Sequence, residues 1–165
     1  MQKVLVIGFG NVARGDDGAG VRAAHKLEEM FCGHPEVRVI AAHQLAPELA
    51  EEIAESARVL FLDAAAGTAP GEILQTCLTA NGALSALGHN VPPAALLFYA
   101  EQLYGEAPPA MCLTITAGSF ELATSLSQPV ADRMDEFVSR ALALIKSWLG
   151  EEAGVVQNSY SANTP

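Results

Sequence analysis

Positive charge is scarce in this sequence of 165 residues. Nine lysines and arginines stand against 19 aspartates and glutamates, which gives a formal net charge of −10, and the basic residues form no stripe along the chain. Nucleic-acid-binding proteins gather lysine and arginine on one face. We therefore expect no nucleic-acid partner.

Cysteine is also sparse. Cys32, Cys77 and Cys112 lie far apart and form no Cys-x-x-Cys pair. This spacing excludes the usual thiolate zinc motifs and gives no sign of a disulfide framework. We expect the three residues to be buried free thiols.

Long apolar runs are lacking as well, and we expect no amino-terminal targeting segment. The run at residues 4–7 is too short for the apolar region of a signal peptide, and no run is long enough to span a bilayer. We therefore expect a cytoplasmic protein without a membrane partner. We also expect a monomer.

Apolar residues make up half of the chain, and only 17% of the residues are charged. This composition and this length suit one packed domain, which we place at residues 1–149. Residues 150–165 are polar and lose the apolar periodicity. We expect this tail to be frayed.

The apolar pattern predicts alternating strands and helices. We expect a first helix with Asp16 and Asp17 at its amino end, and a closing helix capped by Ser127. The strand–helix alternation implies parallel pairing with right-handed crossovers. The fold class is therefore α/β, a three-layer α/β/α sandwich around a mostly parallel, twisted sheet of about five strands. Strands are expected at 3–8, 37–42, 58–63 and 111–117, an edge strand at 71–78, and further helices at 47–56, 92–104 and 130–148.

A glycine-rich turn follows the first predicted strand. Residues 8–13, Gly-Phe-Gly-Asn-Val-Ala, match a dinucleotide-binding fingerprint. That fingerprint needs an acidic residue at the end of the second strand, where this chain has Ala-Ala-His at 41–43. Asp16 and Asp17 also place negative charge where a pyrophosphate would bind. Both observations argue against nucleotide binding.

Chemistry-bearing side chains gather instead at the carboxyl edge of the predicted sheet. Asp63 ends the strand at 58–63, Asp17 begins the first helix at the same edge, and His89 precedes the helix at 92–104. Taken singly, Asp63 could cap a turn and His89 could be a surface histidine. Together they form a ligand set that suits nickel, zinc, iron or manganese and leaves coordination positions open. His43 ends the second strand and is a possible neighbour of this site.

The sequence resembles the hydrogenase maturation proteases, endopeptidases that trim the carboxyl-terminal extension from the large subunit of nickel-iron hydrogenase. The resemblance covers roughly residues 3–149. It rests on Gly8-Phe9-Gly10-Asn11, Gly15-Asp16-Asp17-Gly18-Ala19-Gly20-Val21, Leu62-Asp63-Ala64, His89 ahead of Pro93 and Leu96, and Phe120-Glu121 with Leu126-Ser127.

The resemblance implies that Asp17, Asp63 and His89 contact nickel, and our hypothesis is that Asp17 and Asp63 are the catalytic residues. It implies further that the nickel is carried by the partner, the hydrogenase large-subunit precursor, rather than bound permanently. A water near the nickel would attack the scissile carbonyl and pass its proton to Asp17 or Asp63. Alternatively, the metal would only anchor the substrate. The roles of Asp16 and His43 stay open.

One alternative belongs to another class of protein. In a response-regulator-like phosphoacceptor module, Asp63 would accept a phosphoryl group beside a magnesium-binding pair, Asp16 and Asp17. That chemistry requires acidic residues directly after the first strand and a lysine at the end of the last strand. Here residues 8–15 intervene, and the last strand ends in Thr-Ile-Thr-Ala at 114–117.

Overall fold

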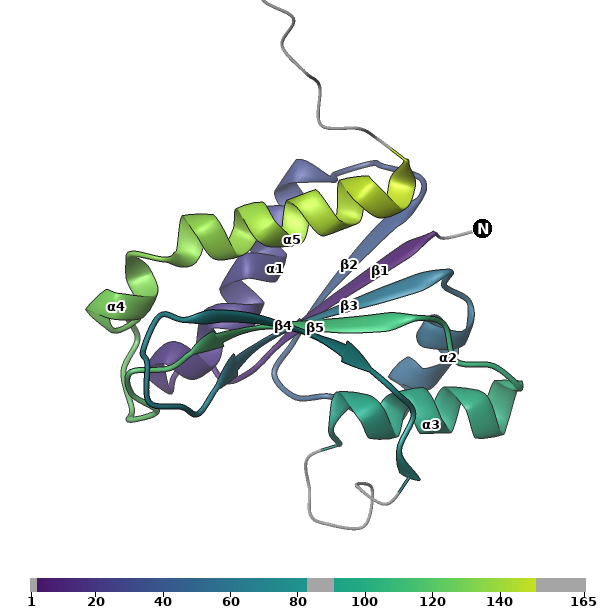
Figure 1. Cartoon of the computed structure of the whole chain (residues 1–165), viewed down its shortest axis with the longest axis horizontal. Helices are drawn as coiled ribbons and strands as arrows, with labels where there is room; N and C mark the ends of the chain where they lie inside the picture. The colour runs from purple at the N-terminus through teal and green to yellow at the C-terminus, as the bar shows by residue number, and fades with distance from the viewer. Residues whose placement is uncertain (1–2, 83–90, 151–165) are drawn as a thin grey trace, which may run out of the picture.

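The computed structural model describes residues 3–82 and 91–150. Its five strands form one sheet in the order β2-β1-β3-β5-β4 (Figure 1). All neighbouring strands are parallel except β4, which runs antiparallel to β5 at the edge. The predicted edge strand is therefore confirmed. The strands are β1 (Val4–Phe9), β2 (Val37–Ala42), β3 (Arg58–Ala65), β4 (Ile73–Leu78) and β5 (Ala110–Thr116).

Helices cover both faces of the sheet. Helices α1 and α5 lie on one face, and α2 and α3 lie on the other (Figure 1). The predicted three-layer α/β/α sandwich is confirmed. The helical elements are the 3₁₀ turn η1 (Gly15–Gly18) and the helices α1 (Ala19–Met30), α2 (Leu49–Ala54), α3 (Pro93–Tyr104), α4 (Gln128–Ala131) and α5 (Met134–Leu149).

Strand β3 shows why an apolar run becomes a central strand. Leu60 and Leu62 pack into the core under α1 and α5, whereas Val59 and Phe61 pack into the core over α2 and α3. All four are fully buried, as expected for a parallel strand covered on both faces. Because side chains alternate along a strand, Asp63 lies on the same face as Phe61.

Helix α1 lies directly on the sheet because glycine occupies the points of closest approach. A Cβ on Gly20 would lie 2.2 Å from the carbonyl oxygen of Leu62, and one on Gly8 would lie 2.2 Å from that of Gly20. No side chain fits in these gaps. The contacts fix the amino end of α1 at the carboxyl edge of β1 and β3.

Three boundaries differ from the prediction. Asp16 and Asp17 lie in η1 rather than in α1, and β3 extends to Ala65, so Asp63 lies within the strand. The predicted closing helix is two helices, α4 and α5. Ser127 does occupy the N-cap position of α4, but its side chain makes no capping bond there.

The cysteine prediction was wrong for two of three residues. All three thiols are free, yet Cys32 and Cys77 are exposed and only Cys112 is buried. Cys77 is exposed because β4 is the edge strand, and Cys32 lies in the turn after α1. Cys112 faces the core from β5, which lies between β3 and β4.

No helix within residues 3–82 and 91–150 is long and apolar enough to cross a membrane. Of the tail predicted at 150–165, only Gly150 belongs to the described residues. The fraying expected there stays a prediction, as does the extent of the domain.

Candidate active site

A cleft of about 400 Å³ opens at the carboxyl edge of the parallel strands. Its wall includes the end of β1, the loop after β2 and the end of β3. Asp17 and Asp63 both line it, so the structure brings these two predicted site residues together. The lining residues are Phe9, Gly10, Asn11, Arg14, Asp17, His43, Gln44, Leu45, Asp63, Ala64, Val91 and Phe120.

Asp63 is half-buried in the cleft wall. Burial raises the pKa of its carboxyl to about 7; a hydrogen bond from the Ala64 amide (2.8 Å) opposes the shift, and the charge of Asp17 adds to it. Burial dominates because the ionised carboxylate loses water that one amide cannot replace. Asp63 can therefore hold or release a proton near neutral pH.

Asp17 enters the cleft from η1 and is oriented by the turn that precedes it. Its Oδ2 atom accepts a hydrogen bond from the Asn11 backbone amide at 2.7 Å. Gly10 has a φ of 135°, and a Cβ there would lie 1.9 Å from the Asp17 carbonyl oxygen. The glycine-rich turn thus wraps around an aspartate. Its Asn11 amide, a donor that a nucleotide phosphate would need, is already engaged.

Asp16 has a different task from its neighbour. It is fully buried, and its carboxylate accepts bonds from the amides of Gly118, Ser119 and Ser127 and from the Ser127 hydroxyl, at 2.6–3.0 Å. Burial by itself would raise the pKa of Asp16, but these four hydrogen bonds outweigh it and lower the pKa. Asp16 therefore anchors the loop at residues 118–127.

This arrangement does not support the response-regulator alternative. That hypothesis needs Asp16 and Asp17 as a pair beside Asp63. Asp17 does line the cleft with Asp63, but the Asp16 carboxylate is taken up by its four donors. A magnesium-binding pair would have to break those bonds.

The third predicted ligand, His89, lies outside the described residues. Val91, two positions later in the chain, lines the cleft. Among the described residues, no group of three histidine, cysteine, aspartate or glutamate side chains is placed to hold a metal ion. The three-ligand set therefore stays a prediction. His43, the possible neighbour, is exposed and does line the cleft.

Sequence reasoning did not propose Arg14 or Phe120 as residues of the site, although both line the cleft. Arg14 lies in the segment between the glycine turn and Asp17, and Phe120 lies in the loop after β5. Both segments follow strands that end at the carboxyl edge. That position was the available signal, because every loop at this edge can reach the same cleft.

Comparison with solved structures shows the class to which the fold corresponds, that of the hydrogenase maturation endopeptidases. The endopeptidase HybD from Escherichia coli is 22% identical, with a TM-score of 0.72 over 88% of this chain and 93% of that one. The protease HycI from Thermococcus kodakarensis is 25% identical, with a TM-score of 0.68 over 90% and 93%. A hydrogenase 2 maturation peptidase from a Thaumarchaeota archaeon is 25% identical, with a TM-score of 0.62 over 92% and 100%.

A scan against protein-family models finds no match, and a search of curated protein sequences finds none either. The similarity is therefore carried by structure. The predicted resemblance to the hydrogenase maturation proteases is confirmed in the fold, over most of the chain.

Proposed function

We propose that this protein is a hydrogenase maturation endopeptidase that removes the carboxyl-terminal extension of the nickel-iron hydrogenase large-subunit precursor after nickel insertion. One observation carries the proposal: Asp17 and Asp63, from separate elements, line one cleft in a fold shared with proteins named as such endopeptidases. The predicted cytoplasmic location and monomeric state are part of the proposal.

Nickel enters this proposal as part of the substrate. Carboxylate oxygens from Asp17 and Asp63 and an imidazole nitrogen from His89 would contact the metal, and thiolates of the precursor would supply other ligands. A precursor without nickel would lack this point of attachment. The metal would then act as a checkpoint, so that cleavage follows only a completed insertion.

The proposed chemistry is hydrolysis of one peptide bond. A water oxygen attacks the scissile carbonyl carbon while a carboxylate, Asp17 or Asp63, takes its proton. The carbon–nitrogen bond then breaks, and the same proton passes to the leaving amine nitrogen. A carboxyl with a pKa of about 7, such as that of Asp63, suits both proton transfers at neutral pH. Nickel would either polarise the reacting groups or only hold the precursor in place.

The test incubates the protein with a large-subunit precursor that either contains or lacks nickel. Mass spectrometry follows the loss of the extension over time. We expect cleavage of the nickel-containing precursor alone. Equal rates on the two precursors would remove the checkpoint, and no cleavage of either would remove the proposed activity.

Variants test the site residue by residue. We expect Asp17→Asn and Asp63→Asn each to reduce processing by at least about a hundredfold, the range of one general acid–base catalyst. His89→Ala should nearly abolish processing as well, because the nickel of the precursor would lose its imidazole contact. Asp132→Asn and His25→Ala are matched controls, because both are exposed residues outside the cleft. Circular dichroism checks that each variant is folded. If a site variant processes the precursor at the wild-type rate, the replaced residue is not part of the active site.

A further inference from the structure

Arg14 is a cation in an acidic protein that has no anionic partner in the described structure. Among residues 3–82 and 91–150, five of the nine basic residues form ion pairs with carboxylates: Lys3, Lys26, Arg38, Arg133 and Arg140. Arg14 lines the same cleft as Asp17 and Asp63, yet no ion pair joins it to either of them or to another described carboxylate. Its charge is available to something that enters the cleft.

The position of Arg14 is fixed by its surroundings. Its backbone amide donates to Asn11 at 3.0 Å, its carbonyl accepts from Asp17 at 3.2 Å, and it forms a β-bridge with Ala123. Its side-chain Nε donates to the Phe120 carbonyl at 3.2 Å. Within the described residues, the two Nη groups make no hydrogen bond. They form the end of the guanidinium, whose paired N–H groups match the two oxygens of a carboxylate.

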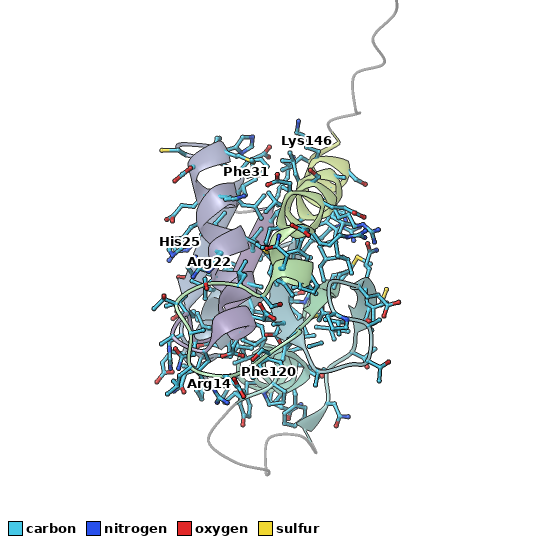
Figure 2. All side chains as sticks on the ribbon, turned by 90° about the vertical axis from the view of Figure 1, so that its left-hand side faces the viewer. Arg14, Arg22, His25, Phe31, Phe120 and Lys146 are labelled. Atoms are coloured by element: carbon cyan, nitrogen blue, oxygen red, sulfur yellow. The ribbon has the colours of Figure 1, made fainter. Side chains whose placement is uncertain are left out.

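Phe120, whose backbone carbonyl accepts the hydrogen bond from Arg14, also lines the cleft. Arg14 and Phe120 lie together near the lower end of the molecule in the view of Figure 2. A cation that lines the cleft suits an anionic group of the chain that occupies it. The two carboxylates of the cleft repel an anion, so such a group would settle at Arg14 and away from Asp17 and Asp63.

We propose that Arg14 binds a carboxylate of the polypeptide segment that occupies the cleft, and thereby fixes the register of that segment against Asp17 and Asp63. The inference rests on the proposed function, under which the substrate is a polypeptide whose anionic groups, apart from the thiolates on nickel, are carboxylates. The carboxylate is an acidic side chain near the scissile bond or the chain-terminal group of the precursor. Arg14 is in this sense a residue that determines specificity.

A purely structural role for Arg14 makes a different prediction, and Arg22 provides the matched control. Both arginines donate to carbonyls of the loop at 118–127, Arg14 to Phe120 and Arg22, through Nη2, to Thr124 at 2.7 Å. Arg22 extends from α1, apart from Arg14 in Figure 2, and does not line the cleft. If tethering the loop were the whole role of Arg14, loss of either arginine would have the same effect.

The experiment measures kcat and KM for processing of the nickel-containing precursor. We expect Arg14→Gln to raise KM roughly tenfold or more with little change in kcat, because a charge-assisted bidentate contact is lost. Arg14→Lys should recover part of the loss, since it keeps the charge without the fork. Arg22→Gln should stay within about twofold of wild type in both constants, because Arg22 does not line the cleft.

Precursor variants identify the carboxylate. One set replaces each acidic residue near the scissile bond by its amide, and another precursor carries an amidated carboxyl terminus. We expect one of these changes to raise the KM of the wild-type enzyme and to add nothing in Arg14→Gln, as coupled partners do in a double-mutant cycle.

Three results would refute the proposed role of Arg14 or the proposed function on which it rests. Equal increases of KM in Arg14→Gln and Arg22→Gln would assign Arg14 to tethering alone. Full additivity between Arg14→Gln and every carboxylate change would also overturn the proposal. A wild-type protein that leaves the nickel-containing precursor uncleaved would instead refute the proposed function, and this inference with it.

Discussion

Replacing Asp63 by asparagine should make the protein more stable at neutral and alkaline pH while removing the proposed activity. The pKa of Asp63 rises from 3.8 to about 7 in the folded protein, a shift of about three units. Each unit corresponds to about 1.4 kcal/mol, so the ionised carboxylate costs the folded state up to roughly 4 kcal/mol. Because Asp63 is half-buried and water screens part of this cost, we expect a gain of about 2–4 kcal/mol.

The gain depends on pH in a defined window. Between about pH 4 and pH 7, Asp63 is ionised in the unfolded chain and protonated in the folded one, so the wild-type free energy of unfolding falls as pH rises. Above about pH 7 both states are ionised and the cost is complete, whereas below about pH 4 both are protonated and it vanishes. Asparagine carries no charge, and its Oδ1 can still accept from the Ala64 amide.

The assay is denaturant unfolding of wild type and Asp63→Asn at several values between about pH 4 and about pH 8, compared as a difference curve. Titrating groups that do not interact with Asp63 cancel in that difference. Asp132→Asn, the same substitution at an exposed aspartate outside the cleft, is the control. A flat curve for Asp63→Asn, or a variant less stable than wild type at about pH 8, would refute the reasoning from burial.

Three further predictions concern the fold. Asp16→Asn should lower the free energy of unfolding by roughly 2–4 kcal/mol at pH 7, because a charged acceptor of four hydrogen bonds is lost. Since the folded-state pKa of Asp16 is lowered, this wild-type advantage should shrink as the pH falls below about 4; an advantage independent of pH would contradict it. Phe137→Ala should cost about 3–5 kcal/mol in chemical denaturation, because Phe137 is fully buried, and a loss below about 1 kcal/mol would contradict that packing. Cys32 and Cys77 are exposed and should react with a thiol reagent in the native protein, whereas Cys112 should react only on unfolding. Burial, and to a smaller extent the charge of Asp63, raises the pKa of the Cys112 thiol to about 12. Equal native rates would be the contrary result.

The strands were predictable because their signal is local. A run such as Val59 to Leu62 is apolar at every position, which is typical of a strand covered on both faces. The strand–helix order then left few topologies, and the observed sheet order is one of them. Asp63 was found in the same way, since it follows such a run at the edge where ligands bind.

The errors arose where distant residues decide the local structure. The sequence predicts Ser127 as a helix cap, but its hydroxyl donates to Asp16, which is 111 positions away in the chain. The local sequence pattern around Ser127 cannot predict that hydrogen bond. The break between α4 and α5 and the exposure of Cys77 on an edge strand likewise depend on neighbours that the sequence does not place.

By itself, the sequence determined the α/β class, the carboxyl edge as the place for a site, and Asp17 and Asp63 as residues near it. Only the tertiary structure decided that Asp16 turns into the loop at 118–127 while Asp17 turns into the cleft, and that Arg14 joins it there. Adjacent aspartates have the same side chain, so residue type alone cannot tell them apart, and it was the family resemblance that selected Asp17. What separates them is where hydrogen-bond donors lie in space, and those donors come from distant segments of the chain.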